Sequence, residues 1–150
     1  MSVIEGQKAP PLSLPTDGSG HLDLTGPAVV YFYPKDDTPG CTNEGKDFSA
    51  LIGDFNALGV AVVGVSRDGV KKHDRFKAKH DLKVILAADE DGVVTEAWGV
   101  WVEKQLYGRK YMGIERATFL IDGSGVVRRV WRNVRVSGHA AEVLAAARGL

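Results

Sequence analysis

The sequence lacks a second cysteine, a long hydrophobic run and an excess of charge of either sign. Its 150 residues include a single cysteine, Cys41, so no disulfide can close within the chain, and a reducing, cytoplasmic location is indicated. The longest apolar runs, residues 28–33 and 60–65, are far shorter than the ~20 residues that span a bilayer. Residues 1–25 contain no apolar segment typical of a secretory signal. We therefore expect a cytoplasmic protein with no membrane partner.

The charge balance disfavours other classes of protein. Nineteen basic and nineteen acidic residues cancel, which argues against binding nucleic acid through its phosphates. The histidines are dispersed and form no cluster at metal-ligand spacing, so we expect no metal and no other cofactor. We interpret all four as surface residues or hydrogen-bonded core residues: His21, His73, His80 and His139. With 44% hydrophobic residues the chain can build a core, and its length fits a single domain, residues 1–150.

Apolar patterns predict strands and helices in alternation. Continuous runs of β-branched and aromatic residues predict strands covered on both faces, at residues 28–33, 60–65 and 84–87. Apolar residues at helical spacing predict helices after Cys41 up to a stop at Gly59, and at residues 70–80, 92–98 and 140–148. In the basic helix 70–80 the expected inward positions are Val70, Phe76 and Ala78.

Turn residues predict two hairpins. The first joins residues 12–14 to 22–24, and the second joins residues 117–121 to 126–131. Residues 103–111 have no clear period and are assigned to neither helix nor strand. Strands joined by helices are expected to be parallel, whereas the hairpins add antiparallel strands. We predict an α/β fold with a central mixed sheet, helices on both faces and an N-terminal β-hairpin extension.

The surroundings of Cys41 favour a reactive cysteine over one that only fills space in the core. Free cysteine is often only a small buried hydrophobe. Here it follows a buried strand and opens a helix, where ligands bind in α/β sheets and where the helix start favours a thiolate. Thr38 places a hydroxyl three residues before the sulfur, and Gly40 permits close backbone approach. The backbone N–H groups of Gly40 and Cys41 can both face an oxygen beside the sulfur.

The spacing Pro34-x-x-x-Thr38-x-x-Cys41 resembles the active-site signature of the peroxiredoxins. The wider string Phe-Tyr-Pro-Lys-Asp-Asp-Thr-Pro-Gly-Cys-Thr resembles the bacterioferritin-comigratory, or Q-type, subfamily, and residues 98–104 and 113–122 agree with it. The resemblance covers almost the whole chain. It implies a thioredoxin-like fold and a thiol-dependent peroxidase, an antioxidant oxidoreductase acting on hydrogen peroxide and organic hydroperoxides.

The resemblance also implies roles for the residues around the cysteine. Cys41 would be the peroxidatic nucleophile and would become a sulfenic acid. Thr38 would hydrogen-bond the sulfur and the peroxide, and Pro34 would pack over the pocket and shield the sulfur. The backbone N–H groups of Gly40 and Cys41 would receive the peroxide oxygen.

Two charged residues acquire roles only through the resemblance. By sequence alone, Arg116 is interpreted as a surface ion-pairing residue and Glu44 as a solvated acid near a helix start. The family pattern implies that Arg116 holds the thiolate and polarises the peroxide. It implies that Glu44 orients Arg116.

The chain departs from the family pattern at the second cysteine. Many Q-type members carry a resolving cysteine five residues after the peroxidatic one, where this chain has Lys46. An external thiol must then reduce the sulfenic acid, supplied by thioredoxin, glutaredoxin or glutathione, and we expect a monomer. The missing partner also excludes a Cys-x-x-Cys dithiol oxidoreductase. The alternative is a peroxide sensor that relays oxidation to another protein; a cysteine hydrolase is less favoured, since no local Cys–His signature exists.

Overall fold

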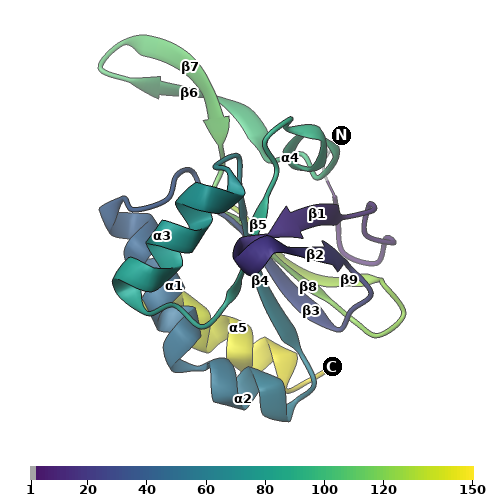
Figure 1. Cartoon of the computed structure of the whole chain (residues 1–150). Helices are drawn as coiled ribbons and strands as arrows, with labels where there is room; N and C mark the ends of the chain where they lie inside the picture. Colours follow the sequence, from purple (N-terminus) through teal and green to yellow (C-terminus); the bar gives the residue numbers. More distant parts are fainter. Residues whose placement is uncertain (1–2) are drawn as a thin grey trace.

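The sheet at the centre of the fold is mixed, as predicted. The computed structural model describes residues 3–150, so the first two residues of the predicted domain 1–150 lie outside it. Seven strands form one sheet in the order β2-β1-β5-β4-β3-β8-β9 (Figure 1). Their bounds are β1 Ser13–Thr16, β2 Gly20–Asp23, β3 Ala28–Phe32, β4 Ala61–Ser66, β5 Ile85–Ala88, β8 Ala117–Ile121 and β9 Val127–Trp131. The helix-linked strands β3, β4 and β5 are parallel, and both predicted hairpins are antiparallel.

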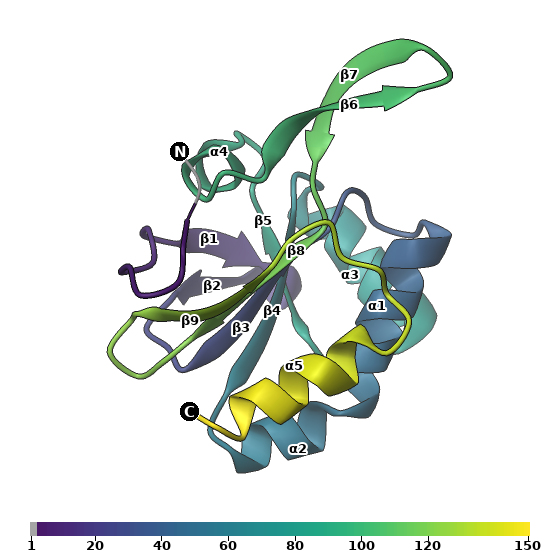
Figure 2. The same ribbon diagram turned by 180° about the vertical axis from the view of Figure 1, so that it is seen from behind.

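Helices cover both faces of the sheet (Figure 2). Their bounds are α1 Pro39–Ala50, α2 Ile52–Ala57, α3 Val70–His80, α4 Val93–Ala97 and α5 His139–Ala147, with a short 3-10 helix at Asp17–Ser19. Along β3, Val29 and Tyr31 face the core under α1, α2, α3 and α5. Val30 and Phe32 face the second core, under α4 and the β1–β2 hairpin. This alternation explains why the strand is apolar at every position.

Three local predictions were wrong. Residues 103–111 are not irregular: β6 Trp101–Leu106 and β7 Arg109–Ile114 pair as a separate two-stranded sheet that projects from the body (Figure 1). The helix after Cys41 is interrupted at Leu51, whose ψ of 6° breaks the helical backbone between α1 and α2. On α3, Ala78 is exposed, and His73 is the buried residue that the apolar pattern missed.

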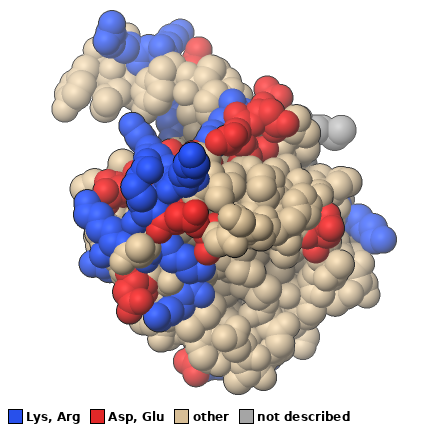
Figure 3. Space-filling view, in the orientation of Figure 1, with Lys and Arg blue, Asp and Glu red and all other residues tan. Residues whose placement is uncertain are grey.

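The surface of α3 carries many basic side chains, and nearby acidic side chains neutralise part of their charge. Figure 3 shows Lys and Arg side chains gathered over this helix, with Asp and Glu side chains among them. Lys72 pairs with Asp68 at 2.9 Å, and Lys77 pairs with Asp17 at 2.7 Å. Within residues 3–150, no helix combines the length and hydropathy that crossing a bilayer requires.

The N-terminal segment before β1 is bound to the far end of the chain. The Gly6 N–H donates to the Val127 carbonyl at 2.8 Å, and the Val127 N–H donates to the Gln7 carbonyl at the same distance. The Ala9 N–H donates to the Gly125 carbonyl at 2.9 Å. Residues 6–9 therefore extend the sheet at the start of β9.

Candidate active site

Cys41 is the third residue of α1 and is 2% exposed. The loop after β3 ends at Thr38, which has extended backbone and precedes the helix, and Pro39 is the first helical residue. The first backbone bond of the helix runs from the Thr42 N–H to the Thr38 carbonyl, at 2.8 Å. The N–H groups of Gly40 and Cys41 precede it and have no intrahelical acceptor. A buried sulfur thus lies at the positive end of the helix.

Sheet pairing brings Arg116 to this sulfur from far along the sequence. Arg116 directly precedes β8, and β8 pairs with β3 so that Ala117 lies opposite Phe32. The guanidinium Nη2 donates to Cys41 Sγ at 3.4 Å, and Nη1 donates to Glu44 Oε1 at 2.6 Å. The structure therefore brings Cys41, Glu44 and Arg116 together around one guanidinium.

Burial sets the ionisation of this group of side chains. Burial raises the pKa of Glu44 to about 7, although Arg116 acts in the opposite direction. Glu44 Oε2 is buried, and among residues 3–150 it has no hydrogen-bond partner. Burial alone would lower the pKa of Arg116, but the charges of Glu44 and Cys41 outweigh it and raise that pKa. The guanidinium is therefore a fixed positive charge beside the sulfur.

Gly40 is where the helix and the guanidinium come closest. A Cβ atom at this position would lie 3.1 Å from Arg116 Nη2. Since Arg116 is held by both Glu44 and Cys41, it has little room to withdraw. A residue without a side chain therefore fits this position.

Thr38 and Pro34 differ in how far their contacts match the expectation. The Thr38 hydroxyl donates to the Lys35 carbonyl at 2.8 Å, so its proton is not directed at the sulfur. Its oxygen retains lone pairs that can accept a hydrogen bond. Pro34 is exposed at the end of β3, and its shielding of the sulfur stays a prediction. Lys46, at the position of the absent resolving cysteine, is exposed on α1.

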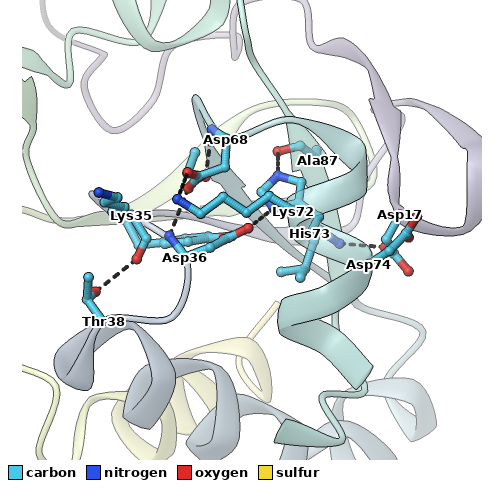
Figure 4. Close-up of polar contacts among 12 residues, drawn as sticks. Asp17, Lys35, Asp36, Thr38, Asp68, Lys72, His73, Asp74 and Ala87 are labelled. Atoms are coloured by element: carbon cyan, nitrogen blue, oxygen red, sulfur yellow. Dashed lines mark hydrogen bonds and ion pairs between the residues drawn. The ribbon is translucent and has the colours of Figure 1, made fainter. Parts of the chain in front are cut away.

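A buried polar group behind the loop was missed by the sequence reasoning. Asp36 accepts a hydrogen bond from the Tyr33 hydroxyl at 2.6 Å, and its other oxygen lies 2.6 Å from His73 Nδ1 (Figure 4). His73 was interpreted as a surface residue or a hydrogen-bonded core residue, and it is the latter. Its place three residues before Phe76 on the inward face of α3 was the available signal. No group of three or more His, Cys, Asp or Glu side chains that could hold a metal is found among residues 3–150.

Comparisons with known proteins agree with this geometry. The sequence profile of the AhpC/TSA family matches residues 5–130. The chain is 51% identical over 148 residues to the putative peroxiredoxin bcp of Coxiella burnetii, covering 96% of this chain and 98% of that protein. It is 45% identical to peroxiredoxin Bcp of Bacillus subtilis, covering 96% of this chain and 94% of that protein. A mutant PrxQ from Xylella fastidiosa has a similar structure, with a TM-score of 0.92 at 37% identity, covering 99% of this chain and 98% of that chain.

Proposed function

The chain belongs to the AhpC/TSA family, as a thiol-dependent peroxidase of the Bcp or Q-type peroxiredoxin group, and on this premise we propose that Cys41 is its peroxidatic residue. In the first step the Cys41 thiolate attacks the distal oxygen of a hydroperoxide. An S–O bond forms while the O–O bond breaks, so sulfur is oxidised to a sulfenic acid and the peroxide is reduced. The leaving oxygen takes a proton from solvent and departs as water or an alcohol.

Arg116 stabilises two negative charges in this step, first on the thiolate and then on the leaving oxygen. It stabilises the thiolate before attack, because the guanidinium lies 3.4 Å from the sulfur. Negative charge then develops on the leaving oxygen, and we assign its stabilisation to the same guanidinium and to the N–H groups of Gly40 and Cys41. Glu44 is a positioning residue, since it holds the guanidinium from the other side at 2.6 Å.

Thr38 and Pro34 complete the proposed pocket. Because the Thr38 hydroxyl donates to Lys35, its oxygen is free to accept the hydrogen of the incoming hydroperoxide and so to orient it. Pro34 limits the approach of solvent to the sulfur. These roles are supported by position and by the matched signature.

The second step uses a thiol from outside the chain. The sulfenic sulfur forms a disulfide with an external thiol and releases water, and a second thiol then restores Cys41. We propose thioredoxin, glutaredoxin or glutathione as the source of this thiol.

We also propose that residues 1–150 form one domain, supported by a sheet that joins both halves of the chain. We propose that the protein is a cytoplasmic monomer. Arg128 and Asp23, exposed on the two edge strands, support the monomer because charged edges discourage pairing between copies.

The observation that carries the proposal is the single guanidinium shared by Cys41 and Glu44 at the start of a helix. The test mixes reduced protein with hydrogen peroxide and follows tryptophan fluorescence by stopped flow, with intact-mass analysis. We expect a fast second-order reaction that adds one oxygen to the chain, and no reaction in the control Cys41→Ser. A rate like that of a free thiol would contradict the proposal. Turnover under a small thiol separates the peroxidase from a relay, whose oxidised form would persist.

A further inference from the structure

The loop that leads to Cys41 is anchored to a buried histidine on another helix. We propose that His73 and Asp36 form a positioning pair that holds residues 33–38, and thereby Thr38 and the start of α1, in the reactive geometry. The proposal rests on the proposed function, because it concerns the same site. Neither residue touches the sulfur or the substrate position, so both act through the loop.

Asp36 is the loop residue on which the anchoring converges. It lies two residues before Thr38 and five before Cys41. Its carboxylate is bound by Tyr33 and His73, and its backbone N–H donates to Asp68 Oδ2 at 2.8 Å. The Tyr33 bond lies within the loop, whereas His73 of α3 and Asp68 in the connection between β4 and α3 hold the loop from outside (Figure 4).

His73 connects this loop to the sheet. Its side chain and that of Asp36 are both 0% exposed. The other ring nitrogen, Nε2, lies 2.9 Å from the carbonyl oxygen of Ala87 on β5. A carbonyl can only accept, so Nε2 carries a hydrogen. The ring is therefore held at both nitrogens and cannot turn without losing a buried hydrogen bond.

One proton between His73 Nδ1 and Asp36 Oδ2 keeps the pair neutral as a whole. The Tyr33 hydroxyl donates to the second carboxylate oxygen, which favours the imidazolium–carboxylate form. Removing this proton would leave an unbalanced negative charge in a fully buried place. Such a charge is strongly destabilising.

The groups that face His73 keep it protonated. They are Asp36 and Tyr33 from the loop, Asp68 from the connection before α3 and the Ala87 carbonyl from β5, while Lys72 pairs with Asp68. Burial lowers the pKa of His73, but the hydrogen bond and charge of Asp36 outweigh it, and the net shift is upward.

This direction fixes the pH dependence. A histidine whose folded-state pKa is raised stabilises the fold fully below its unfolded value of about 6.5, and that stabilisation is lost as pH rises through the higher folded value. Above it the pair loses its proton and the loop loses its anchor. We therefore expect the peroxide reaction of the wild type to decline on the alkaline side, although alkaline pH favours the thiolate.

The experiment measures the second-order rate constant with hydrogen peroxide from neutral to alkaline pH, alongside alkylation of Cys41 by iodoacetamide. Asp36→Asn is the central variant, because its amide can donate to a neutral Nδ1 while its oxygen accepts from Tyr33. We expect it to keep most of the neutral rate and to lose the alkaline decline. We expect His73→Leu to lose ~10–100-fold of the peroxide rate, the range for a small displacement of reacting groups. Alkylation should not fall in either variant.

The chain offers a matched control in the same loop and helix. His80 Nε2 lies 2.8 Å from Asp37 Oδ1, but these side chains are 17% and 41% exposed. Asp37→Asn retains the left-handed backbone, since asparagine adopts φ near 59° readily. We expect this control to keep the wild-type rate and the wild-type alkaline decline.

Three results would contradict the proposal that His73 and Asp36 position the loop. They are an alkaline decline that persists in Asp36→Asn, a peroxide rate in His73→Leu equal to wild type, and equal losses in the peroxide and iodoacetamide reactions. Should His73→Leu fail to fold, Asp36→Asn alone decides. A wild type that reacts with peroxide no faster than a free thiol would contradict the proposed function instead, before any variant is compared.

Discussion

Arg116 is the residue on which the electrostatics of the site depend. It contacts the sulfur of Cys41 with one nitrogen and the carboxylate of Glu44 with another. Its forked shape allows both contacts at once, which a lysine ammonium cannot reproduce. Spacing alone gave no reason to link it to Cys41, because they are 75 residues apart. Only the resemblance to the peroxiredoxins indicated it.

We expect Arg116→Ala to lower the peroxide rate by ~100–1,000-fold, as when one preorganised donor is removed from a developing charge. The rate is measured by stopped-flow tryptophan fluorescence with hydrogen peroxide. Arg116→Lys is the control that keeps the charge and loses the fork, so it should recover part of the rate. If Arg116→Ala leaves the peroxide rate unchanged, the role assigned to Arg116 is wrong.

From the raised pKa of Glu44 we expect the stability of the fold to decrease as pH rises, which is the opposite of the usual effect of a carboxyl group. Its folded-state pKa is raised to about 7, above the ordinary value of 4.5, so the folded protein retains a proton that the unfolded chain has lost. Stability should therefore fall as pH rises from about 4.5 to about 7, by up to about 3 kcal/mol. Glu44→Gln should remove this slope in urea unfolding. An unchanged slope would show that Glu44 titrates normally.

At the scale of elements, the first turn of α1 combines a helix start with a close approach. Gly40→Ala should raise helix propensity, but the new Cβ would lie 3.1 Å from the pinned Arg116 guanidinium. We expect the peroxide rate to fall while the melting temperature stays the same or rises. Gly53→Ala on α2 is the matched control, since its Cβ would meet nothing within 4 Å. It should stabilise by about 0.5–1 kcal/mol and leave the rate unchanged. Equal rates in both variants would contradict this account of Gly40.

Most elements were predictable because they bury a continuous apolar face, as β3 and β4 do. The β6–β7 hairpin was not, because its residues are mostly exposed on both faces, as at Gln105 and Lys110, and so leave no apolar period. The break at Leu51 was hidden for the opposite reason: the apolar spacing continues through it. His73 was missed because a polar residue at an inward position looks like an interruption of the core until its partners are known.

At the scale of the whole molecule, the segment before β1 contributes to the core. Val3 is 6% exposed and belongs to the cluster under α4. Residues 6–9 add backbone hydrogen bonds to the start of β9. The conformational entropy lost when this segment becomes ordered is therefore offset by the burial of Val3 and by the backbone hydrogen bonds of residues 6–9.

We expect deletion of residues 1–9 to lower the free energy of unfolding by about 2 kcal/mol, from the loss of a buried valine and several hydrogen bonds less the entropy regained. Denaturant unfolding measures it. The control Ile4→Ala, at a residue 55% exposed, should be nearly neutral. A deletion as stable as the full chain would show that the segment is not held in solution.

The pairing of residues 6–9 with residues 125–127 also bears on how the chain is made. Residues 6–9 leave the ribosome long before their partners are synthesised. They cannot pair until residues 125–127 have been made, since a contact between distant parts of the sequence forms only after both are present. This strand-like contact therefore closes only once two segments more than a hundred residues apart have both been made, and residues 6–9 wait for their partners until then.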